Sequence, residues 1–238
     1  MQLPFDLPAV GHARAVPITH VFAWYEEALR LFKRAPFGWC LLGLITLGSE
    51  QLLQLVPGIG VAAAKVIVPV VECGMLIAAA ALDHGAPLRL RYAFSAFSAT
   101  PGALAAIVGS ELVVFAATAI AAYLLADVNV LVADTSAQQL SVPTVVGILT
   151  TTMVFTLPLT FVPFAALFGS ASLMSAIATG WSGFVLNVLP LTLFGVFALV
   201  LVTLGMLTYG IGLIAVFPLL SAASYVAWKD VFPAVPAR

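Results

Sequence analysis

The chain has 238 residues, of which 63% are hydrophobic and only 8% are charged. A soluble domain typically contains about 45–50% apolar and about 25% charged residues, so this composition excludes an ordinary soluble fold. The net charge of -1 gives no reason to expect a nucleic-acid partner. The composition instead predicts an all-α, polytopic membrane protein whose first partner is the phospholipid bilayer.

Two segments precede the first apolar stretch. Residues 1–17 contain three prolines and are predicted to be an irregular cytoplasmic tail. Residues 18–35 are predicted to form an amphipathic helix in the cytoplasmic membrane interface, because their length and charge exclude a crossing. Its apolar face is expected to contain Ile18, Val21, Phe22, Tyr25, Ala28, Leu29 and Phe32. Trp24 and Tyr25 are expected near headgroup level. The basic side chains expected to face anionic lipid are Arg30, Lys33 and Arg34.

Six apolar segments are predicted to cross the membrane, at roughly 20 helical residues for each crossing. They are residues 37–56, 61–82, 101–126, 142–168, 184–204 and 208–228. Pro158 and Pro163 are expected to bend the fourth span, because each lacks an N–H. The last apolar stretch is more than twice as long as one crossing requires, so a hairpin is expected at residues 203–212. A single transmembrane domain would then cover residues 36–230, and residues 231–238 would form a second cytoplasmic tail.

The distribution of basic residues predicts the orientation. With a cytoplasmic N-terminus, Lys65 is the one basic residue on the outer side, and the outer loop Asp127–Ser141 contains no base. The positive-inside rule therefore predicts a bacterial inner-membrane protein with both termini in the cytoplasm. The basic residues on the cytoplasmic side are Arg14, Arg30, Lys33, Arg34, Arg89, Arg91, Lys229 and Arg238.

A short pattern recurs before two of the spans. Ala28, Phe32 and Pro36 return at identical spacing as Ala93, Phe97 and Pro101, and residues 170–183 resemble a degenerate third copy. The pattern predicts three units, each made of an interfacial helix, an outgoing span and a returning span. The alternative is that any helix entering a membrane follows a short amphipathic one.

Four charged residues are predicted to lie inside the membrane: Glu50, Lys65, Glu72 and Glu111. A charge in hydrocarbon costs several kcal/mol, so these residues form a candidate intramembrane polar site. Lys65 lies at a depth from which it could reach Glu50. One hypothesis is a proton- or cation-binding path through the first three spans. The others are structural hydrogen-bond links between helices, and contacts to a partner subunit.

The remaining polar residues do not indicate an enzyme, a cofactor or a metal site. His12, His20 and His84 all lie outside the spans, which argues against a haem held by two histidines. Cys40 and Cys73 lack the spacing of a metal site. The chain has no phosphate-binding glycine loop, no nucleophile with a recognisable base and no zinc-protease motif.

Three segments resemble the signatures of a group of small, uncharacterised proteobacterial inner-membrane proteins. They are Trp24–Trp39, Ala81–Gly85 followed by Phe94–Phe97, and Val162–Leu167. This resemblance implies a six-helix inner-membrane fold, and it implies no activity, catalytic residue or ligand.

Two functions are therefore proposed from the sequence. The first is a non-enzymatic accessory, assembly or scaffold component that binds a membrane protein, a lipid or a second copy of itself. Its basis is the short loops and the many small residues available for close helix packing. The second is a small proton- or cation-coupled transporter or channel that uses the buried glutamates.

Overall fold

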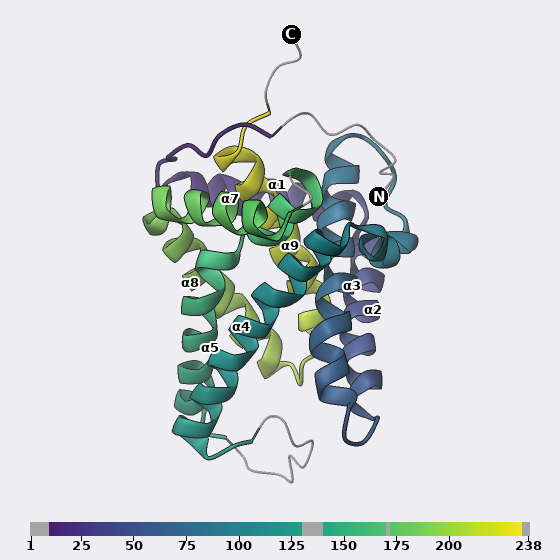
Figure 1. Ribbon diagram of the computed structural model, residues 1–238, viewed down its shortest axis with the longest axis vertical. Helices are drawn as coiled ribbons and strands as arrows, with labels where there is room; N and C mark the ends of the chain where they lie inside the picture. The colour runs from purple at the N-terminus through teal and green to yellow at the C-terminus, as the bar shows by residue number, and fades with distance from the viewer. Residues whose placement is uncertain (1–9, 130–139, 170–171, 235–238) are drawn as a thin grey trace.

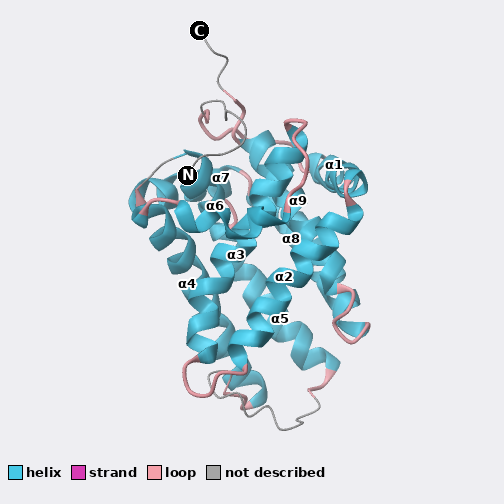
Figure 2. Cartoon of the chain, turned by 90° about the vertical axis from the view of Figure 1, so that its right-hand side faces the viewer, coloured by secondary structure: helices cyan, strands magenta, loops and turns pink. Residues whose placement is uncertain are grey.

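The computed structural model describes residues 10–129, 140–169 and 172–234 (Figure 1). All regular elements in these ranges are helices, and their only β contact is an isolated bridge between Val10 and Ala234 (Figure 2). Five helical segments are long and apolar enough to cross a membrane: Gly60–Asp83, Pro101–Ala126, Val142–Gly169, Val188–Leu207 and Leu213–Val231. The prediction of an all-α polytopic bundle is confirmed, and the helices are those of an integral membrane protein.

Six helices run between the two ends of the bundle: α2 (Pro36–Gln54), α3 (Gly60–Asp83), α4 (Pro101–Ala126), α5 (Val142–Thr156), α8 (Val188–Leu207) and α9 (Leu213–Val231). Helix α2 is missing from the five most apolar segments because its last turns contain Glu50, Gln51 and Gln54. It nevertheless packs along α3 through the same thickness of the molecule (Figure 1). Val10 and Ala234 pair at one end of the bundle. The chain between them must therefore cross the bundle an even number of times. With the five apolar segments, α2 is the sixth crossing helix.

Three further helices lie across one end of the bundle, here named the α1 end (Figure 1). They are α1 (His20–Arg34), the 3₁₀ helix η1 (Leu90–Ser98) and α7 (Leu173–Leu186). Each precedes a crossing helix, namely α2, α4 and α8, as the three predicted units require. Pro36 and Pro101 both occupy the first turn of the following helix, where a missing N–H costs nothing.

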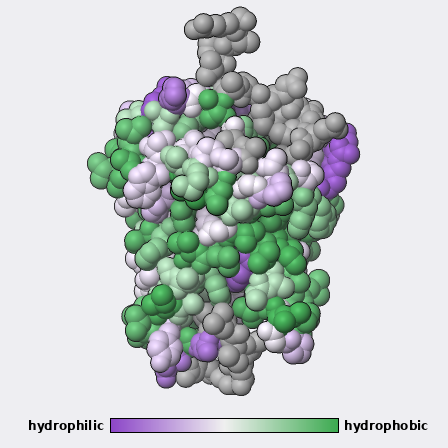
Figure 3. Space-filling model, viewed as in Figure 1, coloured by the Kyte–Doolittle hydropathy of each residue, from purple (hydrophilic) through white to green (hydrophobic). Residues whose placement is uncertain are grey.

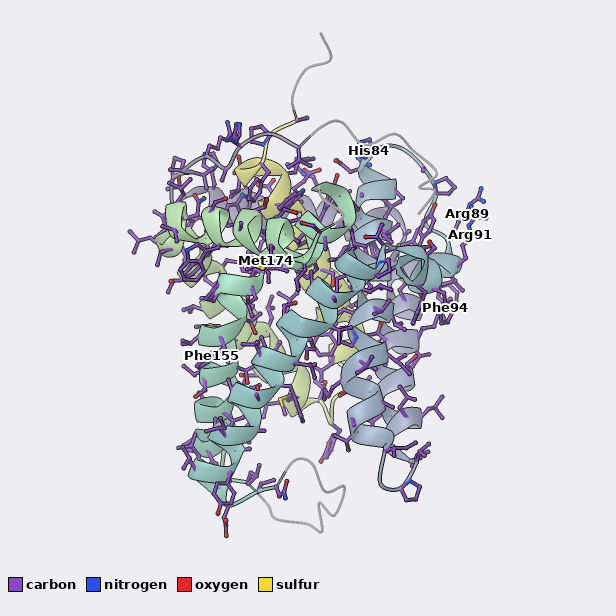
Figure 4. The ribbon with its side chains drawn as sticks, in the orientation of Figure 1. His84, Arg89, Arg91, Phe94, Phe155 and Met174 are labelled. Carbon is purple, nitrogen blue, oxygen red and sulfur yellow. The ribbon has the colours of Figure 1, made fainter. Side chains whose placement is uncertain are left out.

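Helix η1 is held against α3 by a close backbone contact. A Cβ at Gly74 would clash with the backbone of Tyr92 and Ala93, so glycine permits this approach. Tyr92 and Ala93 are buried, whereas the side chains of Arg89, Arg91 and Phe94 project outward from the bundle (Figure 4). The exposed apolar face of η1 agrees with the predicted interfacial position.

Helix α1 is amphipathic, but the face that it buries differs from the predicted one. The buried stripe is Val21, Trp24, Ala28 and Leu31, and it belongs to a helix that packs against α9. Ile18, Phe22 and Leu29, which were predicted on the same apolar face, are exposed. These three side chains remain accessible to lipid, as the predicted interfacial position requires, while a neighbouring stripe of α1 packs on protein.

The fourth predicted span is interrupted at its prolines, as expected. Helix α5 ends at Thr156 and is followed by a 3₁₀ turn, η2 (Leu157–Leu159), a short helix, α6 (Val162–Phe164), and a π-helical turn, η3 (Ala165–Gly169). Pro158 and Pro163 each remove a backbone donor in this stretch. The bend predicted at both prolines is therefore confirmed.

The final hairpin is confirmed, with shifted boundaries. Asn187 separates α7 from α8, so the fifth crossing begins at Val188 and not at residue 184. The turn between α8 and α9 covers residues 208–212, inside the predicted hairpin. Within it, Gly210 has a φ of 80°, a conformation that glycine adopts at no steric cost.

Hydropathy follows the arrangement of the helices. On the face seen in Figure 3, apolar residues dominate the middle of the molecule, and more hydrophilic residues lie toward the two ends. Residues 1–9 and 235–238 of the two predicted tails, which include Arg238, and loop residues 130–139 lie outside the described residues. Residues 10–17 are packed on the protein, since the N–H groups of Gly11 and Arg14 donate to the carbonyls of Pro233 and Val231.

Candidate functional site

A cavity of about 520 Å³ lies among the crossing helices, here named the central cavity. Residues of α2, α3, α4, α5, α8 and α9 line it. Most of its wall is apolar and includes Ile107, Val114, Phe194, Leu199 and Phe217. Its volume falls within the range of about 300–1,000 Å³ that is typical of small-molecule pockets.

The interrupted fourth crossing forms part of the wall. Thr156, Leu159 and Pro163, on both sides of the break, line the central cavity. Because Pro163 has no N–H, the carbonyl of Leu159 lacks its usual helical partner at this wall. Irregular backbone at membrane depth is tolerated where it lines a cavity, and broken helices frequently form the binding sites of transporters.

All four residues of the predicted intramembrane site line the central cavity: Glu50, Lys65, Glu72 and Glu111. The structure therefore brings together residues from three consecutive helices. The predicted contact is confirmed, because Lys65 Nζ donates to Glu50 Oε1 at 2.7 Å. Gln54 Nε2 donates to the same oxygen at 3.2 Å. Lys65 also lies 5.2 Å from the centre of the Phe115 ring, a distance typical of a cation–π contact.

Glu72 and Glu111 differ from Glu50. Neither makes a hydrogen bond or an ion pair with another described residue. Protein surrounds Glu72, yet its side chain remains accessible from within the central cavity that it lines. The two carboxylates also repel each other when both are ionised. The cavity thus contains three carboxyl groups and one ammonium group, and two of the three carboxyl groups lack a partner.

Several hydroxyl groups of the wall donate to carbonyls of their own helices. Thr46 donates to the carbonyl of Leu42, and Ser110 donates to that of Ile107. Thr152 donates to the carbonyl of Ile148, and it also contacts Thr118 across the α4–α5 interface at 2.8 Å. These donors are occupied, whereas the side chains of Ser224, Glu72 and Glu111 make no hydrogen bond with a described residue, and only the two glutamates among them can carry a charge.

The acidic residues do not converge as metal ligands. Within the described part of the chain, no group of three His, Cys, Asp or Glu side chains could hold a metal ion. Cys73 is buried in the cavity wall and Cys40 lies on α2, and both are free thiols.

The aromatic residues predicted at headgroup level point into the protein. Trp24 is only 1% exposed, and its indole N–H donates to Asp230 Oδ2 at 2.9 Å. Tyr25 stacks on Phe194 and donates its hydroxyl to the carbonyl of that residue. Burial raises the pKa of the Tyr25 hydroxyl, which keeps it protonated as a donor. The contact with α8 and α9 explains this correction.

The basic residues of α1 also have protein partners. Arg30 contacts Glu26 and Glu27 on its own helix, and Arg34 donates to the carbonyl of Leu82 at the end of α3. Both side chains are nevertheless exposed, so the expectation that they face anionic lipid stays a prediction. Lys33 is exposed, as expected.

Three polar links at the α1 end went unnoticed in the sequence. Asn187 is fully buried and bonds to the N–H of Val16 and to the carbonyls of Arg14 and Gly183. Asp230 accepts from Arg14 and Trp24 and also bonds to His20. Asp83 accepts from Tyr225 and Lys229. The one signal available was that Asn187, Asp83 and Asp230 are polar residues at the ends of apolar runs.

No protein family model, no curated protein and no solved structure matches this chain. The resemblance to uncharacterised six-helix inner-membrane proteins stays a prediction. Function must therefore be argued from the central cavity itself.

Proposed function

We propose that this protein is a small proton- or cation-coupled transporter or channel whose central cavity holds the transported ion. The observation that carries the proposal is the cavity with two carboxyl groups that lack partners, Glu72 and Glu111, at membrane depth. A carboxylate in this environment is costly, and it is either neutralised by a proton or paired with a bound cation. Both routes make the group a carrier of positive charge.

The interrupted crossing supports the same proposal. The break around Pro158 and Pro163 forms one wall of the cavity, and a discontinuous helix is a structural element that can change shape around a bound ion. The Glu50–Lys65 pair lines the same cavity, on α2 and α3. We propose that this pair holds α2 against α3 while Glu72 and Glu111 exchange their proton or cation.

The distribution of charge supports an orientation. In the described ranges, Arg14, Arg30, Arg34, Arg91 and Lys229 all belong to elements at the α1 end, and Lys65 faces the central cavity. We propose that the α1 end faces the cytoplasm of a bacterial inner membrane, as the positive-inside rule requires.

Reconstitution into lipid vesicles tests the proposed transport. Vesicles that contain the wild-type protein and an internal pH-sensitive dye should show proton movement when a membrane potential is applied, above the level of empty vesicles. Glu72→Gln and Glu111→Gln should each abolish this movement, because the amide cannot carry a proton. Glu26→Gln is the matched control, since Glu26 lies exposed on α1 and outside the central cavity.

Wild-type vesicles that conduct neither protons nor monovalent cations would contradict the proposal. So would a Glu72→Gln variant that is folded and transports normally. In either case the accessory or scaffold function predicted from the sequence becomes the better proposal. Purification in mild detergent should then retain a stoichiometric protein or lipid partner.

A further inference from the structure

The wall of the central cavity determines what kind of cation fits it. Ile107, Val114, Phe194, Leu199 and Phe217 place hydrocarbon and aromatic surface beside the two free carboxyl groups. A small inorganic cation is bound by several converging oxygen ligands, commonly six for Mg²⁺ and about six to eight for Ca²⁺. The described acidic side chains do not converge in that way.

The charge of the cavity determines the charge of the ligand. Lys65 already neutralises Glu50 through the 2.7 Å contact between them. Glu72 and Glu111 have no such partner, and each also interacts electrostatically with Lys65 and Glu50. When either free carboxyl group is ionised, the cavity therefore has an excess of negative charge that a single ammonium group could compensate.

We infer that the central cavity binds an amphipathic organic cation, with a protonated amine at Glu72 and an apolar body against the walls of α4, α8 and α9. This inference rests on the proposed function and names the class of its substrate. The cavity of about 520 Å³ accommodates a ring system with a short aminoalkyl chain. Phe194 and Phe217 add aromatic surfaces on which such a body can pack.

Two probes of nearly equal shape separate the contribution of the ammonium charge to binding from that of the apolar body. Naphthylethylamine has an ammonium group at neutral pH, and naphthylethanol has nearly the same shape without the charge. Binding of each probe is measured by isothermal titration calorimetry on the full chain in lipid nanodiscs, against empty nanodiscs. The amine should bind at least about tenfold more tightly than the alcohol, because only the amine pairs with a carboxylate.

Matched variants assign the ammonium group to its partner. Glu72→Gln should weaken binding of the amine by about tenfold or more and leave the weak binding of the alcohol unchanged. Glu26→Gln on α1 should bind the amine like the wild type. Thermal melting of each variant in the same nanodiscs verifies that the protein is folded. Equal affinity for amine and alcohol, or unchanged binding by Glu72→Gln, would overturn the inference.

Comparing the binding of the amine with that of sodium and potassium ions distinguishes this inference from the proposed function. If sodium or potassium ions bind, the amine does not, and ion movement in vesicles still requires Glu72, then the substrate class is wrong and the transport function stands. If neither binding nor ion movement is found, both fail. Native mass spectrometry of the extracted protein shows whether a ligand with an amine group co-purifies from the membrane. An amine-bearing lipid that naphthylethylamine displaces would support binding and assign the ligand to the membrane.

Discussion

The α1 end and the central cavity handle polar groups in opposite ways. At the α1 end, Asn187 and Asp230 each bond to several partners and join the N-terminal segment, α1, α7 and α9. In the central cavity, Glu72 and Glu111 make no hydrogen bond with any described residue. Both carboxyl groups stay accessible within the cavity, so no buried side-chain polar atom of the described residues is left unsatisfied. At the α1 end polar groups hold the fold together, whereas two carboxyl groups of the cavity remain unbonded among the described residues, as the proposed binding site requires.

The largest loss of stability is expected at Trp24. Trp24→Ala removes a side chain that is 1% exposed and leaves Asp230 without its indole donor. The expected cost is about 3–5 kcal/mol in the free energy of unfolding, as for other buried tryptophans. Phe22→Ala is the matched control on the same helix, because Phe22 is 59% exposed and should cost far less. Thermal melting in detergent compares the two, and equal losses would show that α1 is held by lipid and not by protein.

A smaller loss is expected at Asn187. Asn187→Ala leaves the N–H of Val16 and the carbonyls of Arg14 and Gly183 without a side-chain partner. The expected total cost is about 1–3 kcal/mol in the free energy of unfolding, the range for leaving a buried polar group unsatisfied. Limited proteolysis should also cut the segment around Val16 faster. Gln51→Ala, which truncates an exposed amide on α2, is the control and should melt like the wild type.

Variants of the Glu50–Lys65 pair test whether a polar contact in the cavity contributes to the stability of the fold. Lys65→Met leaves Glu50 without its cation and should destabilise the protein. Breaking a fully buried ion pair costs about 3–5 kcal/mol, and the loss here should be smaller because both side chains are partly exposed. The double variant Glu50→Gln with Lys65→Met should recover most of the loss, because no unpaired charge remains. A double variant as unstable as the sum of the single ones would show that the two residues act independently.

The sequence predicts much of the architecture because membrane physics acts on segments of fixed length. The apolar runs locate the crossing helices, Pro158 and Pro163 locate the break, and the depth of Lys65 predicts its contact with Glu50. The packing of part of α1 on protein could not be predicted, because an apolar stripe packs equally well on lipid and on protein. Trp24 is the clearest case, since its partner Asp230 lies 206 residues further along the chain.

The central cavity is harder to predict from the sequence than the crossing helices are. The sequence indicates that Glu50, Glu72 and Glu111 lie at membrane depth and suggests a shared path, but it does not indicate the cavity or its apolar wall. That depends on how the side chains of six crossing helices pack, including the close approach of α2 to α9 at Gly43, where a Cβ would clash with the backbone of Ile214. The long-range bonds of Asn187 escaped prediction for the same reason.

The melting temperature of Glu72→Gln tests the central claim most directly. If the Glu72 carboxyl group is kept for a ligand and not for the fold, its replacement by a neutral amide removes repulsion from Glu111 and breaks no hydrogen bond within the described structure. The variant should then melt at the wild-type temperature or slightly above it, a trade-off common at functional sites. A clear fall in melting temperature would contradict the account, because it would make Glu72 a structural link between helices.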